Sequence, residues 1–197
     1  FQVDADVKVN TNTEKYVAWC WKAGTTVSGD TTGEGTLKTY TGSVNTDAGV
    51  SITKYIGNGT SDHRIPHNLG AVPKLVIVKN LDAGESFVVM ATNILTSSNW
   101  YLVLDTQVAQ ADASGTVFYQ WPSSTYFGIG TDAETNTNDA NYIAYSFTSI
   151  QGFSKISTFK GNGNADGTFV YTGFKPAYVM TKGNIADGWA IWDNKRE

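Results

Sequence analysis

The two histidines, His63 and His67, come nearest in type and spacing to a metal-binding motif. On a helix, histidines four residues apart would share one face and could ligate zinc. Pro66 lies between them and Gly70 follows, so the segment favours a strand and a turn. No third ligand is evident, because the single cysteine, Cys20, lies in an aromatic segment. We therefore predict packing and hydrogen-bonding roles for both histidines, and no metal site.

A second motif, Asn-Gly-Asn-Ala-Asp-Gly at residues 162–167, resembles the start of a calcium-binding loop. Oxygen-bearing side chains alternate along it, and glycine occupies its sixth position. Its twelfth position is Gly173 instead of a bidentate glutamate, and the loop offers fewer oxygens than the roughly six to eight that Ca²⁺ takes. Residues 57–60 repeat the Gly-Asn-Gly pattern without the acids. The motif is therefore interpreted as a turn between strands.

Side chains suited to covalent or acid–base catalysis are present but do not form a recognised pattern. The sequence has no G-x-S-x-G motif, and no base lies near Cys20 along the chain. Paired carboxylates could cleave glycosides, yet each acid lies where a solvated turn would also place one. These acids are Asp82, Glu85, Asp105, Asp132 and Glu134. We predict no enzymatic activity and no cofactor.

Aromatic side chains are the stronger lead to a binding function. The chain has 6 tryptophans and 10 tyrosines among many polar residues. Exposed aromatic faces stack on sugar rings, whereas an alternating strand must bury one of its two faces. Trp100 follows Ser-Ser-Asn and Trp121 precedes Pro122, so both lie at the edges of elements. They are the residues predicted to contact a glycan or a receptor.

The elements that position these residues are predicted to be strands. Short segments of alternating side chains, rich in β-branched and aromatic residues, are separated by Gly, Asn, Asp and Ser. These segments are 16–21, 50–56, 74–79, 86–90, 100–104, 126–129, 141–147, 155–159, 168–171, 177–182 and 188–192. Residues 107–114 have weak helical character, while 24–47 and 131–139 read as a long loop and an exposed turn. The pattern predicts an all-β, antiparallel, sandwich-like fold.

Composition excludes several partners for the 197-residue chain. With 14 basic against 18 acidic side chains the net charge is −4, whereas a phosphate-binding surface needs a cationic excess. No apolar run approaches the roughly 20 residues of a membrane helix. A single cysteine excludes a disulfide framework within the chain. We predict neither a nucleic-acid nor a membrane partner.

The two halves of the sequence resemble each other, which predicts an internal repeat. Residues 16–21 match 142–147 at an offset of 126, and residues 51–59 match 155–163 at an offset of 104. Residues 73–79 match 176–182 at 103, and residues 87–90 match 189–192 at 102. We expect a lead-in strand or linker at 1–15, a first β unit at 16–140 containing the long loop 24–47, and a second unit at 141–197.

The second unit is expected to be incomplete, because nothing after Trp192 matches the strands that end the first unit. A sheet without its last strands has open edges, which natural proteins cover or pair. Either the residues belong to a longer chain, or another subunit supplies the missing strand. The second explanation predicts an oligomer.

The same segments resemble a family of uncharacterised repeats in virion structural proteins of tailed bacteriophages, especially marine and cyanobacterial ones. They are YVAWCWKAG (16–24), SITKYIGNGTSDHRIPHNLGAVPKLVIVKN (51–80), YIAYSF (142–147), KISTFKGNGNADGTFVYTGFKPAYVMTK (155–182) and WAIWD (189–193). Members of that family resemble tail fibres, capsid fibres or other proteins of the particle surface. The resemblance implies location in the virion, other virion subunits as partners, and homo-oligomers.

We therefore expect a bacteriophage virion structural protein: a tail fibre, an appendage or a capsid decoration. It would act by β-mediated assembly and attach to a host surface glycan. The alternative is a lectin-like carbohydrate-binding module or receptor-binding tip. A third class, a depolymerase, is kept open because fibres of this kind sometimes degrade surface glycans.

Overall fold

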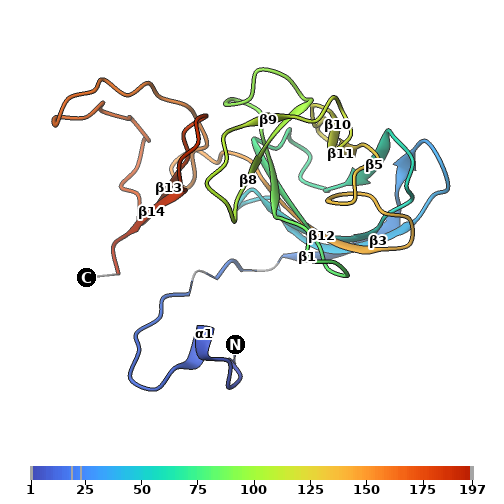
Figure 1. The fold of residues 1–197 in the computed structure, drawn as a ribbon, viewed down its shortest axis with the longest axis horizontal. Helices are drawn as coiled ribbons and strands as arrows, with labels where there is room; N and C mark the ends of the chain where they lie inside the picture. The colour runs from blue at the N-terminus through green and yellow to red at the C-terminus, as the bar shows by residue number, and fades with distance from the viewer. Residues whose placement is uncertain (1, 19, 23, 196–197) are drawn as a thin grey trace.

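The structure is a computed structural model that describes residues 2–18, 20–22 and 24–195, and strands predominate in it (Figure 1). One short helix, α1 (Val7–Asn10), lies near the N-terminus. The carboxylate of Asp6 caps this helix by accepting a hydrogen bond of 2.8 Å from the backbone N–H of Lys8. All pairs of described strands are antiparallel. The prediction of an all-β, antiparallel fold is confirmed.

The described strands form three sheets. The largest has eight strands in the order β1-β3-β4-β12-β6-β7-β8-β9, the second has four in the order β10-β11-β5-β2, and the third pairs β13 with β14. The strands of the first sheet are β1 (Thr25–Asp30), β3 (Thr39–Asn45), β4 (Val50–Ile56), β12 (Asn141–Phe147), β6 (Leu75–Asn80), β7 (Val88–Ala91), β8 (Trp100–Val103) and β9 (Ala111–Asp112). The others are β10 (Phe118–Gln120), β11 (Tyr126–Ile129), β5 (His63–Pro66), β2 (Thr32–Gly33), β13 (Tyr178–Thr181) and β14 (Ala190–Asp193).

The hydrophobic core lies between the eight-stranded and four-stranded sheets. Val76 and Val78 of β6 face it from the larger sheet, and Ile65, Phe127 and Ile129 face it from the smaller one; all five side chains are fully buried. Side chains alternate between the two faces of a strand, so the period of two in the sequence translates directly into this burial. We call these two sheets the sandwich.

Strand β12 lies in the middle of the eight-stranded sheet. It pairs with β4 on one side and with β6 on the other, so that Ala144 lies between Thr53 and Val78. The sequence repeat assigns this strand to the start of the second unit, with a boundary between residues 140 and 141. In the structure that boundary separates a sheet from one of its own central strands. Order along the chain does not determine which strands pair.

Residues 24–47 form strands β1, β2 and β3 instead of the predicted long loop. β1 and β3 pair from Thr25 opposite Val44 to Asp30 opposite Thr39. Tyr40 and Val44 are buried, whereas the threonines of β1 are exposed. The segment can therefore be polar overall. Its strand β3 pairs with β4 and so joins the large sheet, while one face of the segment stays in solvent.

Several other predicted elements differ from the structure. The described residues of 16–21 form no strand, and Trp19 of that segment lies outside the described residues. Residues 155–159 and 168–171 also form no strand, and 107–114 contain β9 instead of helical turns. The lead-in 1–15 contains α1, and no strand is described there. The strands predicted around β13 and β14 are present.

Candidate assembly surface

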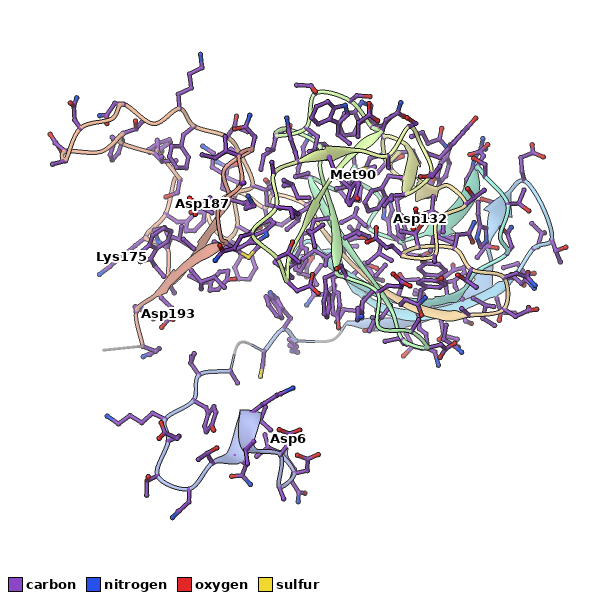
Figure 2. The ribbon with its side chains drawn as sticks, viewed as in Figure 1. Asp6, Met90, Asp132, Lys175, Asp187 and Asp193 are labelled. Atoms are coloured by element: carbon purple, nitrogen blue, oxygen red, sulfur yellow. The ribbon has the colours of Figure 1, made fainter. Side chains whose placement is uncertain are left out.

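Residues 151–195, which we call the C-terminal arm, contain no buried side chain in the structure. The buried side chains of the described chain all lie between Thr31 and Thr148. The arm extends from the sandwich at the left of Figure 1 and carries the pair β13–β14. Figure 2 places Lys175 and Asp187 on this arm, away from Met90 in the core. The arm therefore has no hydrophobic core of its own within the chain.

Large apolar side chains are nevertheless exposed along the arm. The exposed fraction is 86% for Phe169 and 71% for Tyr171. The complete set on the arm is Phe153, Phe159, Phe169, Val170, Tyr171, Val179, Ile185 and Trp192. Exposure of large apolar side chains to water costs free energy, which a partner that covered them would recover.

Besides local bonds to residues 148–150, three hydrogen bonds of the described residues connect the arm to the sandwich. Trp189 Nε1 donates to the backbone oxygen of Val103 at 2.8 Å, and its ring packs against the core. The backbone N–H of Gln110 donates to the oxygen of Asn184 at 3.4 Å. Nearer the start of the arm, an Asn93 side chain reaches the backbone oxygen of Ile156 at 3.5 Å. These bonds place β13 and β14 beside the end of the large sheet that holds β8.

The calcium-like motif on the arm forms a bend closed by its own hydrogen bonds. Asn162 Oδ1 accepts from the backbone N–H of Asn164 at 3.0 Å, and Asn162 Nδ2 donates to the oxygen of Asp166 at 2.9 Å. All three residues are exposed. Gly163 has a φ of 71°, a backbone conformation that favours glycine. This geometry agrees with the predicted turn.

His63 is fully buried in the sandwich and both of its ring nitrogens have partners. Its Nδ1 lies 3.0 Å from Asn136 Oδ1, and its Nε2 lies 2.7 Å from Thr31 Oγ1. Asn136 Oδ1 is an acceptor, so His63 donates from Nδ1 and accepts from the threonine hydroxyl. Burial lowers the pKa of His63 and favours this neutral form.

His67 is also fully buried and hydrogen-bonded. The backbone N–H of Leu69 donates to its Nδ1 at 3.2 Å, and its Nε2 donates to the backbone oxygen of Ser123 at the same distance. Burial lowers the pKa of His67 as well. Both histidines thus have the predicted packing and hydrogen-bonding roles. Within the described residues, no three His, Cys, Asp or Glu side chains are grouped closely enough to hold a metal ion.

Asn136 has a structural role that no pattern in the sequence indicates. It is fully buried, although it lies in the segment predicted to be an exposed turn. Its Oδ1 accepts from the backbone N–H of Asn58 at 2.8 Å, while its Nδ2 donates to the oxygens of Gly130 and Thr60 at 2.6 and 2.8 Å. The side chain therefore links three segments, and no local sequence pattern reports such long-range contacts.

One of the acids considered for catalysis, Glu134, lies near three of the others. The pKa of Glu134 is raised to about 7, mainly by burial and further by the negative charges of Asp132, Glu85 and Asp105. Asp132 lies over the sandwich in Figure 2, away from the arm. The raised pKa follows from burial near like charges, which disfavours the ionised carboxylate.

The other acid, Asp82, has a different environment. Its Oδ2 accepts hydrogen bonds from the backbone and side chain of Asn141, at 2.7 and 3.0 Å. These bonds lower the pKa of Asp82 because they stabilise the carboxylate. Asp82 thereby fixes the start of β12 beside the end of β6.

The two predicted contact tryptophans lie on different sheets. Trp100 begins β8 in the large sheet and is half-buried against the core. Trp121 follows β10 in the small sheet, and 39% of its surface is exposed. The structure thus leaves Trp121 accessible, and a glycan or receptor contact at these residues stays a prediction.

Comparison with known proteins gives a family and no function. A family described as a domain of unknown function, DUF7483, matches residues 1–197. No curated protein and no solved structure matches the chain. The part of the chain that the structure describes contains no helix with the length and apolar character needed to cross a membrane.

Proposed function

The chain belongs to the DUF7483 family, whose function is unknown, and we propose that it is a non-enzymatic structural protein of a bacteriophage virion. It would serve as a tail fibre, an appendage or a capsid decoration, assembling through β-structure with other virion subunits and with copies of itself. The observation that carries this proposal is the C-terminal arm, which exposes large apolar side chains and buries none. The assignment to a virion is supported by the resemblance of the repeated segments to repeats in virion structural proteins of tailed bacteriophages.

Two related β units, the second incomplete, are part of this proposal. Val179 of β13 pairs with Trp192 of β14, and the residues 103 and 102 positions earlier, Val76 and Met90, also pair across β6 and β7. The other three pairs correspond in the same way: Tyr178–Asp193 with Leu75–Ala91, Met180–Ile191 with Ile77–Val89, and Thr181–Ala190 with Val78–Val88. The sequence offsets and the strand registers are thus the same, which supports a common pattern.

Glycine conformations give further support. Gly59 and Gly163, which occupy the same place in the two Gly-Asn-Gly turns, have φ angles of 69° and 71°. Gly70 and Gly173, 103 positions apart, have φ angles of 69° and 85°. Residues with a side chain adopt such angles rarely, so these glycines fix turns of the same kind in both units.

The proposal is tested on purified particles and on the purified chain. Antibodies raised against the chain should label the tail or the capsid surface in electron micrographs of the particles. Analytical ultracentrifugation of the chain should show oligomers whose proportion rises with concentration. A chain that is absent from the particles and stays monomeric at all concentrations would overturn the proposal.

Trp121 favours a second candidate function, a lectin-like carbohydrate-binding module. Its exposed ring could stack on the face of a sugar, because an indole ring combines a large apolar surface with a polar N–H group. On a glycan array, Trp121→Ala and Trp100→Ala should each weaken binding at least tenfold, whereas Trp192→Ala, an exposed tryptophan on the arm, should not. No binding of the unmodified chain to any host glycan would exclude this candidate.

A further inference from the structure

We propose that residues 168–171 of the C-terminal arm pair with the same residues of a second copy, as two antiparallel strands related by a two-fold axis. Val170 of one copy would lie opposite Val170 of the other, and Phe169 opposite Tyr171. This inference rests on the proposed assembly function, and it names the segment and the partner through which two copies join.

The segment is the sequence counterpart of strand β5 and the residue that follows it. Ile65 and His67 lie 104 positions before Phe169 and Tyr171. Both are fully buried, and β5 pairs with β11 in the small sheet. On the arm, residues 168–171 pair with no strand of the described chain, and both aromatic rings are exposed. A partner strand would therefore cover on the arm what the sandwich already buries.

One edge of the segment can receive a partner strand. In an extended segment, successive residues turn their backbone groups to opposite edges. On one edge, Lys155 Nζ donates to the backbone oxygen of Tyr171 at 2.6 Å. The other edge would present the backbone groups of Thr168, Val170 and Thr172, none of which forms a hydrogen bond within the residues that the structure describes. Val170 of each copy would exchange two backbone hydrogen bonds with its equivalent across this edge.

The order of side chains makes the segment complementary to itself. Its sequence is Thr-Phe-Val-Tyr, so two aromatic residues flank one valine. With Val170 on the two-fold axis, Phe169 of each copy lies opposite Tyr171 of the other, and all four rings point to one face. A shift by one residue would set Phe169 against Val170, and a shift by two would leave two rings without an aromatic partner. Aromatic pairs across strands stabilise a sheet, which favours the proposed register.

The charges that flank the segment are complementary between copies. Asp166 precedes the segment and Lys175 follows it, and both side chains are exposed. Within the described residues, neither of them forms an ion pair. In the two-fold arrangement the start of one segment lies beside the end of the other, so Asp166 of each copy comes near Lys175 of the other. Opposite charges at both ends favour a second copy as the partner.

The proposed contact is small for a protein interface. Four aromatic rings at about 150 to 250 Å² each would bury roughly 600 to 1,000 Å². Stable interfaces bury at least about 1,200 Å², so the purified chain should dimerise weakly. Copies held side by side on a particle would pair more readily, because a contact between tethered partners forms at a high effective concentration.

A disulfide bond between two copies tests the pairing. Opposite residues that exchange backbone hydrogen bonds have Cα atoms about 5.5 Å apart, a separation that a disulfide spans. Cys20→Ser removes the natural cysteine, and Val170→Cys is added to this chain. Under mild oxidation the chain should form a covalent dimer whose 170–170 bond is identified by peptide mass spectrometry.

Val179→Cys in the same background is the matched control. Val179 also lies on the arm, and its exposed fraction of 38% is close to the 36% of Val170. Position 179 lies outside the proposed pair. We expect at least tenfold more covalent dimer from position 170 than from position 179.

Mixing two charge variants in the Val170→Cys chain tests the two-fold arrangement. Asp166→Lys gives a chain with a positive charge on both sides of the segment, and Lys175→Asp gives one with a negative charge on both sides. Each variant alone brings like charges together, whereas the mixture brings opposite charges together at both ends. With a size tag on one variant, the mixed dimer should exceed either homodimer at least fivefold, against twofold for random pairing. About 1 M salt should remove this preference by screening the charges.

Equal crosslinking at positions 170 and 179, or a mixed dimer at the level of random pairing, would overturn the inference. Circular dichroism checks that each variant is folded. Chains that oligomerise and label the particle without the 170–170 bond would leave the proposed function intact and refute only the pairing of the arms. Chains that are monomeric and absent from particles would refute the proposed function itself.

Discussion

Glu134 shows how the environment of a single side chain controls its ionisation in this protein. Burial and the neighbouring acids raise its pKa from 4.5 to about 7. The unfolded chain releases this proton near pH 4.5, whereas the folded chain holds it until about pH 7. The stabilisation linked to Glu134 is therefore complete at low pH and is lost as the pH rises through 7.

We predict that Glu134→Gln removes this loss of stability. Between pH 5 and pH 8 the free energy of unfolding of the unmodified chain should fall by about 1 to 2 kcal/mol more than that of the variant, a range reduced for partial exposure. Urea denaturation at a series of pH values measures this difference. Glu14→Gln, which changes an exposed acid, should keep the pH dependence of the unmodified chain. Identical pH profiles for Glu134→Gln and the unmodified chain would contradict the prediction.

His63 represents the opposite case, a buried base whose neutral form is hydrogen-bonded on both nitrogens. We predict that His63→Ala lowers the free energy of unfolding by about 3 kcal/mol, because Asn136 and Thr31 each lose a partner inside the sandwich. Asn162→Ala, in the exposed bend of the arm, should change it by less than about 0.5 kcal/mol. Urea denaturation at pH 7 compares the two, and similar effects would contradict the structural role of His63.

At the scale of elements, β12 holds the large sheet together. It is the strand through which β1, β3 and β4 connect to β6, β7, β8 and β9. Tyr142 and Ala144, which point into the core, are fully buried. Without β12, two parts of the sheet would each have an unpaired edge and the core would be open to water.

We therefore predict that a chain ending at residue 140 does not fold, whereas one ending at residue 154 does. The longer chain keeps β12 and loses the arm beyond residue 154, which contributes no buried side chain. Thermal unfolding followed by circular dichroism should be cooperative for the longer chain and absent for the shorter one. A cooperative transition in the shorter chain would show that β12 is dispensable.

Across the whole molecule, the buried apolar side chains of the described residues are all in the sandwich part of the chain, between residues 31 and 148. The arm buries none and exposes Phe169 and Tyr171 most strongly among its aromatic residues. Replacing exposed side chains changes the stability of a single chain little, but it removes apolar contact area from an interface. Stability and assembly should therefore respond to different substitutions.

We predict that the double variant Phe169→Ser, Tyr171→Ser oligomerises at least tenfold more weakly while its unfolding temperature stays within about 2 °C of that of the unmodified chain. Sedimentation velocity and calorimetry measure the two quantities. Val108→Ser is the control, because Val108 is a large apolar residue with 47% exposure outside the arm. Unchanged oligomerisation of the double variant would exclude these aromatic residues from the interface.

Local alternation of side chains was enough to predict several strands of the sandwich. Strands β4, β11 and β12 have the predicted bounds, β6 is displaced by about one residue at both ends, and β8 ends about one residue early. The roles of His63 and His67 were also predictable, because proline and glycine nearby exclude a helix. In these segments the alternation of side chains indicates which face of the strand is buried. This signal lies within the strand itself and needs no information about distant residues.

Which strands pair and which polar residues are buried could not be predicted from the local sequence and became clear in the tertiary structure. The placement of β12 between β4 and β6, the ordering of residues 24–47 and the burial of Asn136 all depend on partners far away in the sequence. A polar segment such as β1 becomes ordered because a neighbouring strand satisfies its backbone hydrogen bonds, whatever its hydropathy. A local sequence pattern shows that side chains alternate along a strand, whereas the pairing of strands depends on residues throughout the chain.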